Sequence, residues 1–178
     1  KATPATASAV ATNDVTAITE QCMPAVVAIT STTEGTDYYD LFEQYYQGQD
    51  EVSAGTGIIV GKNDTELLIA TNNHVVDGAK AISVQFIDEE VYDAKTKGND
   101  SSADLAVIAV KLKDMKKSTL NSIRISALGD SSESKVGEMV VAIGNALGYG
   151  QSVTVGYVSA KDREITEQSE DGSAKSSK

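Results

Sequence analysis

The chain contains a single histidine, His74, within the segment Thr71-Asn72-Asn73-His74-Val75-Val76, and an aspartate, Asp104, stands later at the head of an apolar run. A histidine after one β-branched run and an aspartate before the next have the types and chain order of the first two members of a His–Asp–Ser triad. In such a triad the imidazole takes the proton of the serine hydroxyl and later gives it to the leaving amine, while the carboxylate holds the other ring nitrogen. Histidine suits both steps because its ordinary pKa is close to neutral pH.

Taken alone, these two residues also have a simpler interpretation. A lone histidine in a turn is often only a surface residue, and an aspartate before an apolar run often marks a turn or a strand end. The third member of a triad should lie later, in a Gly-x-Ser-Gly-Gly segment, and the sequence contains none. The nearest match, Asp171-Gly172-Ser173-Ala174, has no glycine after its serine, so we expect no nucleophile within these 178 residues.

The composition excludes several classes of function. The net charge of −11 disfavours binding to nucleic acid, because phosphate binding needs a positive surface. A lone cysteine, Cys22, permits no intramolecular disulfide and, with one histidine, no structural zinc site. We therefore expect no metal and no cofactor, and we expect Cys22 to be a buried, unreactive thiol. No apolar run approaches the roughly 20 residues of a membrane-spanning helix.

Short β-branched runs separated by Gly, Asn and Asp predict many strands and few helices. This pattern is typical of an all-β barrel or sandwich. A short helical turn is expected at 14–21, before Pro24. Strands are expected at 25–30, 55–60, 67–71, 81–86, 91–96, 105–110, 138–143 and 153–158.

The predicted strands divide the chain into a first barrel at 14–115 and an incomplete second barrel at 122–166, joined by the Lys-rich stretch 111–122. The second part contains only about two obvious strands, and closing a barrel takes several more. The Ala/Thr/Ser-rich segment 1–13 is expected to be a disordered linker, and the segment 167–178 a polar tail without strands.

An insertion at 34–53 concentrates most of the aromatic side chains of the chain. Several of its apolar positions follow helical spacing, which indicates a short amphipathic helix packed on the barrel. Exposed aromatic patches also often form contacts, so an equally good interpretation is a loop that docks on a neighbouring subunit or gates an active site. The residues concerned are Tyr38, Tyr39, Leu41, Phe42, Tyr45 and Tyr46.

Five longer motifs stand in order along the chain: Gly55-Thr56-Gly57-Ile58-Ile59-Val60, Ile69-Ala70-Thr71-Asn72-Asn73-His74-Val75-Val76-Asp77-Gly78-Ala79, Asp100-Ser101-Ser102-Ala103-Asp104-Leu105-Ala106-Val107-Ile108, Ala127-Leu128-Gly129-Asp130-Ser131 and Gly150-Gln151-Ser152-Val153-Thr154-Val155-Gly156. With these motifs the chain, from about Pro24 to Ile165, resembles the HtrA/DegP family of trypsin-like serine proteases. The resemblance implies a chymotrypsin-like double β-barrel, with the first barrel complete and the second truncated. It implies that His74 is the general base, that Asp104 orients it, and that 34–53 is the regulatory loop of the family, which can contact other subunits. Ser152 aligns with a non-catalytic position of the family.

The same resemblance implies a serine endopeptidase that hydrolyses unfolded or misfolded proteins through an acyl-enzyme, in protein quality control. The chain is then expected to be an inactive N-terminal part of the protease domain, since its nucleophile lies elsewhere. The implied partners are unfolded proteins and either further copies of the chain or its missing C-terminal part. The implied location is the periplasm or cell surface, with a membrane anchor. The alternative is a non-catalytic pseudoprotease or chaperone-like peptide-binding module, which would have no chemical need of His74 and Asp104.

Overall fold

The computed structural model describes residues 15–35, 50–144 and 151–161 in full. It also describes the backbone of four short strands: β2 (Tyr38–Tyr39), β3 (Tyr45–Tyr46), β11 (Ile165–Gln168) and β12 (Ala174–Ser177). The prediction of a disordered linker at 1–13 lies outside the described residues.

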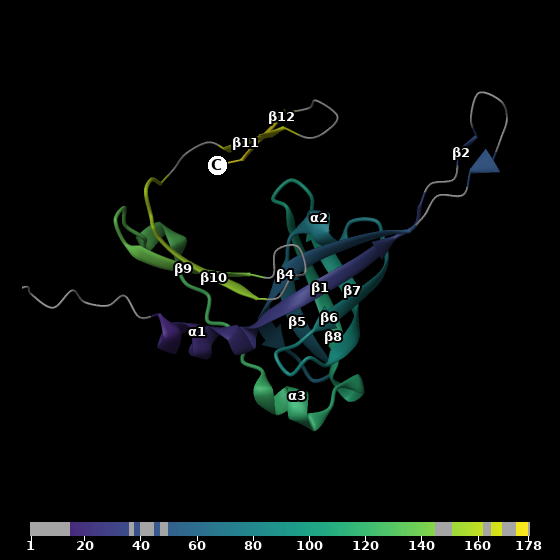
Figure 1. The fold of residues 1–178 in the computed structure, drawn as a ribbon, viewed down its shortest axis with the longest axis horizontal. Helices are drawn as coiled ribbons and strands as arrows, with labels where there is room; N and C mark the ends of the chain where they lie inside the picture. Colours follow the sequence, from purple (N-terminus) through teal and green to yellow (C-terminus); the bar gives the residue numbers. More distant parts are fainter. Residues whose placement is uncertain are drawn as a thin grey trace, which may run out of the picture.

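Six antiparallel strands form a closed barrel in the order β1-β4-β5-β8-β7-β6, and β6 pairs back onto β1 to complete it (Figure 1). All six predicted strands of the first barrel are confirmed, and with them the all-β class. The strands are β1 (Val26–Thr33), β4 (Glu51–Lys62), β5 (Glu66–Thr71), β6 (Ala79–Gln85), β7 (Val91–Asp100) and β8 (Leu105–Lys111).

The barrel encloses an aliphatic core because its strands alternate inward and outward side chains. In β5, Leu67 and Ile69 are buried while their neighbours are half-exposed. Burying one such side chain stabilises the fold by roughly 1.5–3 kcal/mol. Gly57 of β4 lies so close to the core side chains that a Cβ atom at this position would be 2.6 Å from Cγ2 of Ile69. The other large, fully buried side chains are Val27, Ile29, Ile59, Val84, Ile108, Val110 and Thr119.

A short helix, α1 (Thr16–Cys22), and a 3-10 turn, η1 (Met23–Ala25), precede the barrel, which confirms the helical turn predicted before Pro24. The prediction that Cys22 is buried was wrong, because α1 lies outside the barrel with no buried residue and its thiol-bearing side chain is exposed. No helix in the described part of the chain has the length and apolarity to span a membrane.

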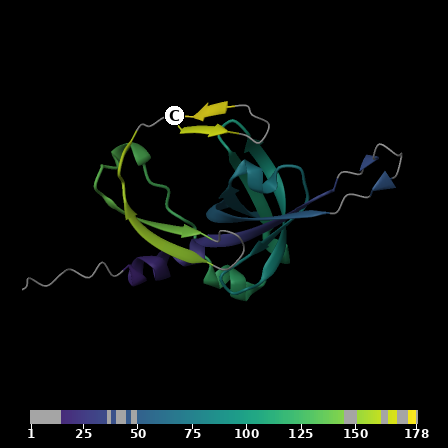
Figure 2. The ribbon, with the colours of Figure 1, turned by 45° about the horizontal axis from the view of Figure 1, so that its top comes forward.

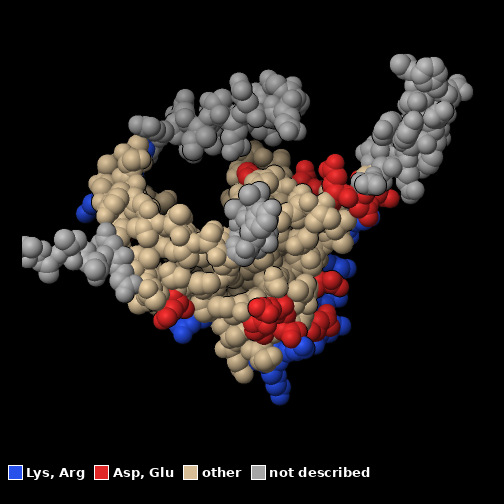
Figure 3. All heavy atoms as spheres, viewed as in Figure 1, with Lys and Arg blue, Asp and Glu red and all other residues tan. Residues whose placement is uncertain are grey.

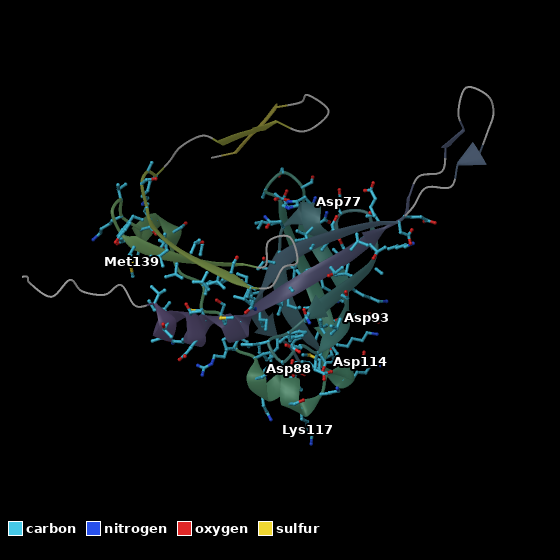
Figure 4. All side chains as sticks on the ribbon, viewed as in Figure 1. Asp77, Asp88, Asp93, Asp114, Lys117 and Met139 are labelled. Atoms are coloured by element: carbon cyan, nitrogen blue, oxygen red, sulfur yellow. The ribbon has the colours of Figure 1, made fainter. Side chains whose placement is uncertain are left out.

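The Lys-rich stretch after β8, expected to be a simple linker, is folded onto one end of the barrel as η2 (Leu112–Asp114) and α3 (Lys117–Ser122). Met115 and Thr119 are buried, and Leu112, Leu120 and Ile123 pack against the core. Apolar side chains every three to five residues among the lysines therefore close this end. Asp114 and Lys117 mark this end, and Asp77 lies at the opposite one (Figure 4).

The chain then passes through η3 (Ser131–Glu133) into a two-stranded ladder, β9 (Met139–Gly144) and β10 (Ser152–Tyr157), at the positions predicted for the second barrel. Figure 2 shows this ladder beside the barrel. It is tied to the barrel by Gln151 Nε2, which donates to the Val26 carbonyl at 3.1 Å, and by Ser126 N, which donates to the Ile59 carbonyl at 2.8 Å.

Of the two interpretations left open for the aromatic insertion, the described residues do not support the amphipathic helix. Tyr38 pairs with Tyr46 and Tyr39 with Tyr45 in a short antiparallel ladder. Aromatic and β-branched residues favour strands, which outweighs the helical spacing. In the polar tail expected at 167–178, β12 pairs antiparallel with β11, with Ile165 opposite Ser177. Leu41 and Phe42 lie outside the described residues.

Candidate active site

The barrel brings His74 and Asp104 together through the register of two neighbouring strands. β5 ends at Thr71 and β8 begins at Leu105, and the two strands are antiparallel with Thr71 opposite Ala106. The residues that follow β5 therefore meet the residues that precede β8 at one end of the barrel. His74 lies in the one-turn helix α2 (Asn73–Val76) directly after β5.

Three hydrogen bonds orient the carboxylate of Asp104. His74 Nδ1 lies 2.8 Å from Asp104 Oδ2, and the backbone N–H of His74 donates to Oδ1 at 2.9 Å. Asn72 Nδ2 donates to Oδ2 at 3.0 Å. Because an ionised carboxylate only accepts hydrogen bonds, Nδ1 carries the proton in this contact, and in the neutral ring Nε2 is then the nitrogen with the lone pair.

These bonds also set the charge state of Asp104. Burial raises the pKa of this carboxyl, but the backbone and ring donors of His74, the charge of the ring when protonated and the Asn72 amide together leave the pKa below its ordinary value. The carboxylate is therefore ionised at neutral pH and able to stabilise a protonated imidazole.

The short helix α2, which contains His74, is held by contacts with β1, with β7 and with the core of the barrel. Ser31 Oγ of β1 donates to the Val75 carbonyl at 2.6 Å, and both Val75 and Val76 are buried in the core. Asn99 of β7 donates from Nδ2 to Asn73 Oδ1 at 2.6 Å. The histidine thus stands on a fixed turn with buried residues on either side of it in the chain.

The turn that delivers Asp104 is organised by Asp100. Its Oδ1 accepts from Ser102 N at 2.9 Å, from Ser102 Oγ at 2.6 Å and from Ala103 N at 3.2 Å. The Ser102 hydroxyl, followed by the two backbone donors, lowers the pKa of Asp100. Asp104 itself has φ +50°, in the left-handed region that non-glycine residues rarely adopt. Asp100 therefore holds the loop that supports this uncommon conformation.

The ring of His74 faces outward, with 72% of its side chain exposed, whereas Asp104 exposes 34%. A shallow hollow lies beside the pair, lined by Thr56, Gly57, Ile58, Ala70, Thr71, Asn72 and Leu105. Ile58 and Leu105 are exposed apolar residues. The pair thus stands at the edge of an uncovered, mainly apolar surface.

The structure joins the two predicted residues, His74 and Asp104, and adds others that sequence reasoning missed. Ser31 gives no signal in the sequence because its role depends on strand pairing. Asn72 stands two residues before the histidine, yet its amide reaches the aspartate instead. The nearest serine candidate, Ser173, lies outside the described residues, as do the side chains of the aromatic insertion. Among the residues that the structure describes, no three His, Cys, Asp or Glu side chains gather to hold a metal ion.

Comparison with known proteins shows what the whole chain is similar to. Residues 55–177 match the family described as "Trypsin-like peptidase domain". A probable periplasmic serine endoprotease DegP-like of Hahella chejuensis is 38% identical over 89% of this chain and 36% of its own length. The periplasmic pH-dependent serine endoprotease DegQ of Escherichia coli is 32% identical over 81% of this chain and 32% of its own length. The chain therefore spans about a third of the length of these curated relatives.

Solved structures of HtrA-type proteases are also similar to this chain. The HtrA-type protease AlgW with a decapeptide is 27% identical and superposes with a TM-score of 0.59 over 85% of this chain and 46% of that one. A variant of AlgW with a tripeptide is 30% identical, with a TM-score of 0.60 over 85% of this chain and 40% of that one.

Proposed function

The chain belongs to the family of trypsin-like peptidase domains, and on this basis we propose that it forms part of a serine endopeptidase of the HtrA/DegP type. The names of its relatives and the HtrA-type structures bear out the resemblance that the motifs indicated, together with the chymotrypsin-like fold class. The observation that carries the catalytic proposal is the 2.8 Å contact between His74 Nδ1 and Asp104 Oδ2, which leaves Nε2 on the exposed side of the ring.

In this mechanism His74 is the general base and Asp104 the residue that orients it. His74 Nε2 takes the proton of a serine hydroxyl as the serine oxygen attacks the carbonyl carbon of a peptide bond. The imidazolium, stabilised by the ionised Asp104, then gives the proton to the leaving amine, which leaves an acyl-enzyme. Water attacks the ester in the same way, with His74 again as base. The reaction needs no cofactor.

The serine is proposed to come from a part of the protein outside these 178 residues. This agrees with the length of the relatives, of which the chain spans about a third. The uncovered surface beside the pair also supports it, because Ile58 and Leu105 are exposed there. On β9 and β10, Val140 and Val155 are exposed as well, and the face over these strands and β4 is largely uncharged (Figure 3). We propose that the remainder of the protease domain, or further copies of the chain, cover this surface.

The proposed substrates are unfolded or misfolded proteins, bound as extended peptides. The titles of the AlgW structures, which record a tripeptide and a decapeptide, support peptide binding for this type of site. The proposed location is outside the cytoplasm, because relatives are named as periplasmic enzymes. A membrane anchor in the full-length protein is a further part of the proposal and rests on the family resemblance alone. The aromatic hairpin of β2 and β3 is proposed as a regulatory loop that contacts other subunits or gates the site.

The test is labelling of the full-length protein with a fluorophosphonate, which phosphonylates activated serine hydroxyls and releases fluoride, followed by intact-mass measurement under denaturing conditions. We expect the full-length protein to be labelled, and the isolated chain of 18.6 kDa to stay unlabelled. His74→Ala and Asp104→Asn in the full-length protein should slow labelling by roughly 10⁴-fold.

Asp130→Asn is the matched control, since Asp130 holds its own turn by accepting from Ser132 N at 2.9 Å and takes no part in the pair. Its rate of labelling should equal that of the unmodified protein. A full-length protein that binds unfolded casein but is never labelled would establish the alternative, a non-catalytic peptide-binding module. A labelled 18.6 kDa chain would contradict the external nucleophile.

A further inference from the structure

Asn72 stands at the N-cap of α2 but does not act as a cap. Its backbone is extended, with φ −80° and ψ 147°, as an N-cap requires, and asparagine is among the favoured residues there because its side-chain oxygen accepts from the first helical N–H groups. In this helix the Asn72 side chain makes no such bond. Its amide group points instead at the residue that orients the histidine.

Both hydrogen bonds of this amide end on one residue. Asn72 Nδ2 donates to the Asp104 carboxylate at Oδ2, 3.0 Å away, and to the Asp104 backbone carbonyl oxygen, 3.1 Å away. Both partners are oxygens without a hydrogen atom, so the side chain must present its NH₂ group and not its oxygen. The two amide hydrogens match the two acceptors in number.

Both hydrogen bonds of Asn72 end on Asp104, whose backbone conformation is uncommon for a non-glycine residue. Asp104 has φ +50°, and a left-handed aspartate needs its surroundings to hold it. A donor on the carbonyl fixes the orientation of the peptide group, and a donor on Oδ2 fixes the side chain. Oδ2 is also the oxygen that lies 2.8 Å from His74 Nδ1.

We propose that Asn72 is a positioning residue, whose amide holds the backbone and carboxylate of Asp104 so that Oδ2 stays on His74 Nδ1. The inference rests on the proposed function for its catalytic meaning, but its geometric content concerns only these three residues. A merely structural link between the end of β5 and the start of β8 would contribute to stability without selecting the protonated nitrogen of His74. The tautomer of His74 therefore separates the two roles.

The experiment is a long-range ¹H–¹⁵N correlation of the uniformly ¹⁵N-labelled 178-residue chain at about pH 9, well above the ordinary pKa of a histidine. His74 is the only histidine, so its two ring nitrogens need no further assignment. We expect the unmodified chain to be mainly in the Nδ1–H form. Asn72→Ala should lower the ratio of Nδ1–H to Nε2–H about fivefold or more, the effect of one lost net hydrogen bond.

The matched control is Asn63→Ala at the other end of β5. Asn63 Oδ1 also organises a turn, accepting from Thr65 N at 2.9 Å and Glu66 N at 2.8 Å, so its loss has a comparable structural effect away from the pair. Asn63→Ala should leave the tautomer ratio unchanged. Asn72→Ser, which has one donor in place of two, should give an intermediate ratio. If the amide spectrum shows that Asn72→Ala is unfolded, the tautomer ratio of Asn72→Ser tests the proposal instead.

An unchanged ratio in a folded Asn72 variant, or an equal change in Asn63→Ala, would overturn the proposal. A ring that is mainly Nε2–H in the unmodified chain would overturn it as well. The measurement involves no serine, so a failure of fluorophosphonate labelling would reject the proposed function and leave the positioning of Asp104 by Asn72 standing.

Discussion

The hydroxyl of Ser31 donates a 2.6 Å hydrogen bond to the carbonyl oxygen of Val75, and this buried contact joins the first strand of the barrel to the residue after His74. Ser31 is 2% exposed, so the carbonyl cannot exchange this partner for bulk water. A single hydroxyl therefore links the position of the candidate base to the core of the barrel.

Replacing Ser31 by alanine should lower the free energy of unfolding by about 1–3 kcal/mol, the cost of a buried acceptor without its donor. Urea denaturation measures this change. Ser83→Ala is the control, because its hydroxyl lies on the surface and 3.4 Å from the Thr30 carbonyl, and its effect should stay within about 0.5 kcal/mol. Equal losses of unfolding free energy in the two variants would show that the hydrogen bond to Val75 contributes no more to stability than the surface hydroxyl of Ser83.

The strands of the barrel could be predicted because β-branched runs and their Gly, Asn and Asp boundaries are local signals. The packing of α3 against one end of the barrel could not be predicted from such local signals. Met115 and Leu120 are separated by lysines whose charges dominate the composition, and only the tertiary fold shows that the apolar side chains face the core. Tyr38 and Tyr46 show the limit of helical spacing as a signal, since it left a helix open as one interpretation where the two residues pair across strands.

Within the site, residue types and order suggested His74 and Asp104, and the longer motifs around them made them the candidates. Their contact depends on the register of β5 against β8, in which Thr71 faces Ala106. The supports from Ser31 and Asn72 depend on side-chain directions that no local pattern specifies. The sequence therefore predicts which groups are candidates for the chemistry, while the fold alone shows what holds them.

Two glycines of the same strand should respond differently to substitution. A Cβ on Gly57 would lie 2.6 Å from Ile69 Cγ2 and 2.8 Å from Ile29 Cδ1, so Gly57→Ala should cost about 1–3 kcal/mol through overpacking. No atom lies within 4 Å of the corresponding position at Gly61, and Gly61→Ala should change stability by less than about 0.5 kcal/mol. Thermal denaturation of both variants tests the comparison, and a similar loss at Gly61 would contradict the steric argument.

Stability should depend on pH through Asp104. The hydrogen-bond donors around this carboxylate lower its pKa in the folded chain, so the folded state favours the ionised form. The resulting stabilisation is complete above the ordinary aspartate pKa of about 3.9 and is lost as pH falls through the lowered folded value. The difference in unfolding free energy between the unmodified chain and Asp104→Asn should therefore shrink below about pH 4.

Urea denaturation of both proteins between about pH 6 and pH 2 measures this difference. The pKa values of Asp100 and Asp130 are also lowered, in each case first by the side chain of a nearby serine, and both carboxylates are present in the two proteins. Their contributions cancel in the comparison. Parallel curves over the whole range would exclude a stabilising role for the ionised Asp104.

The closed end of the barrel depends on a chain of hydroxyl groups. Tyr92 OH lies 2.9 Å from Thr119 Oγ1, which donates to Asp88 Oδ2 at 2.7 Å, and Lys116 N donates to Tyr92 OH at 3.1 Å. Among the described residues, the other oxygen of Asp88, Oδ1, is buried without a hydrogen-bond partner. Thr119→Val should therefore cost about 1–3 kcal/mol, because it removes the donor that Oδ2 has in Thr119.

Tyr92→Phe keeps the ring that packs edge-on against Phe86, with centroids 5.7 Å apart, and removes only the hydroxyl. We expect a loss of about 1 kcal/mol. Thr119→Ser, which retains the hydroxyl, separates the bond from methyl packing and should cost less than Thr119→Val. Because Tyr92 and Thr119 belong to one network, the double variant should differ from the sum of the single changes by roughly 0.5 kcal/mol or more. Strict additivity in urea denaturation would show that the two hydroxyls act independently and would exclude a coupled network.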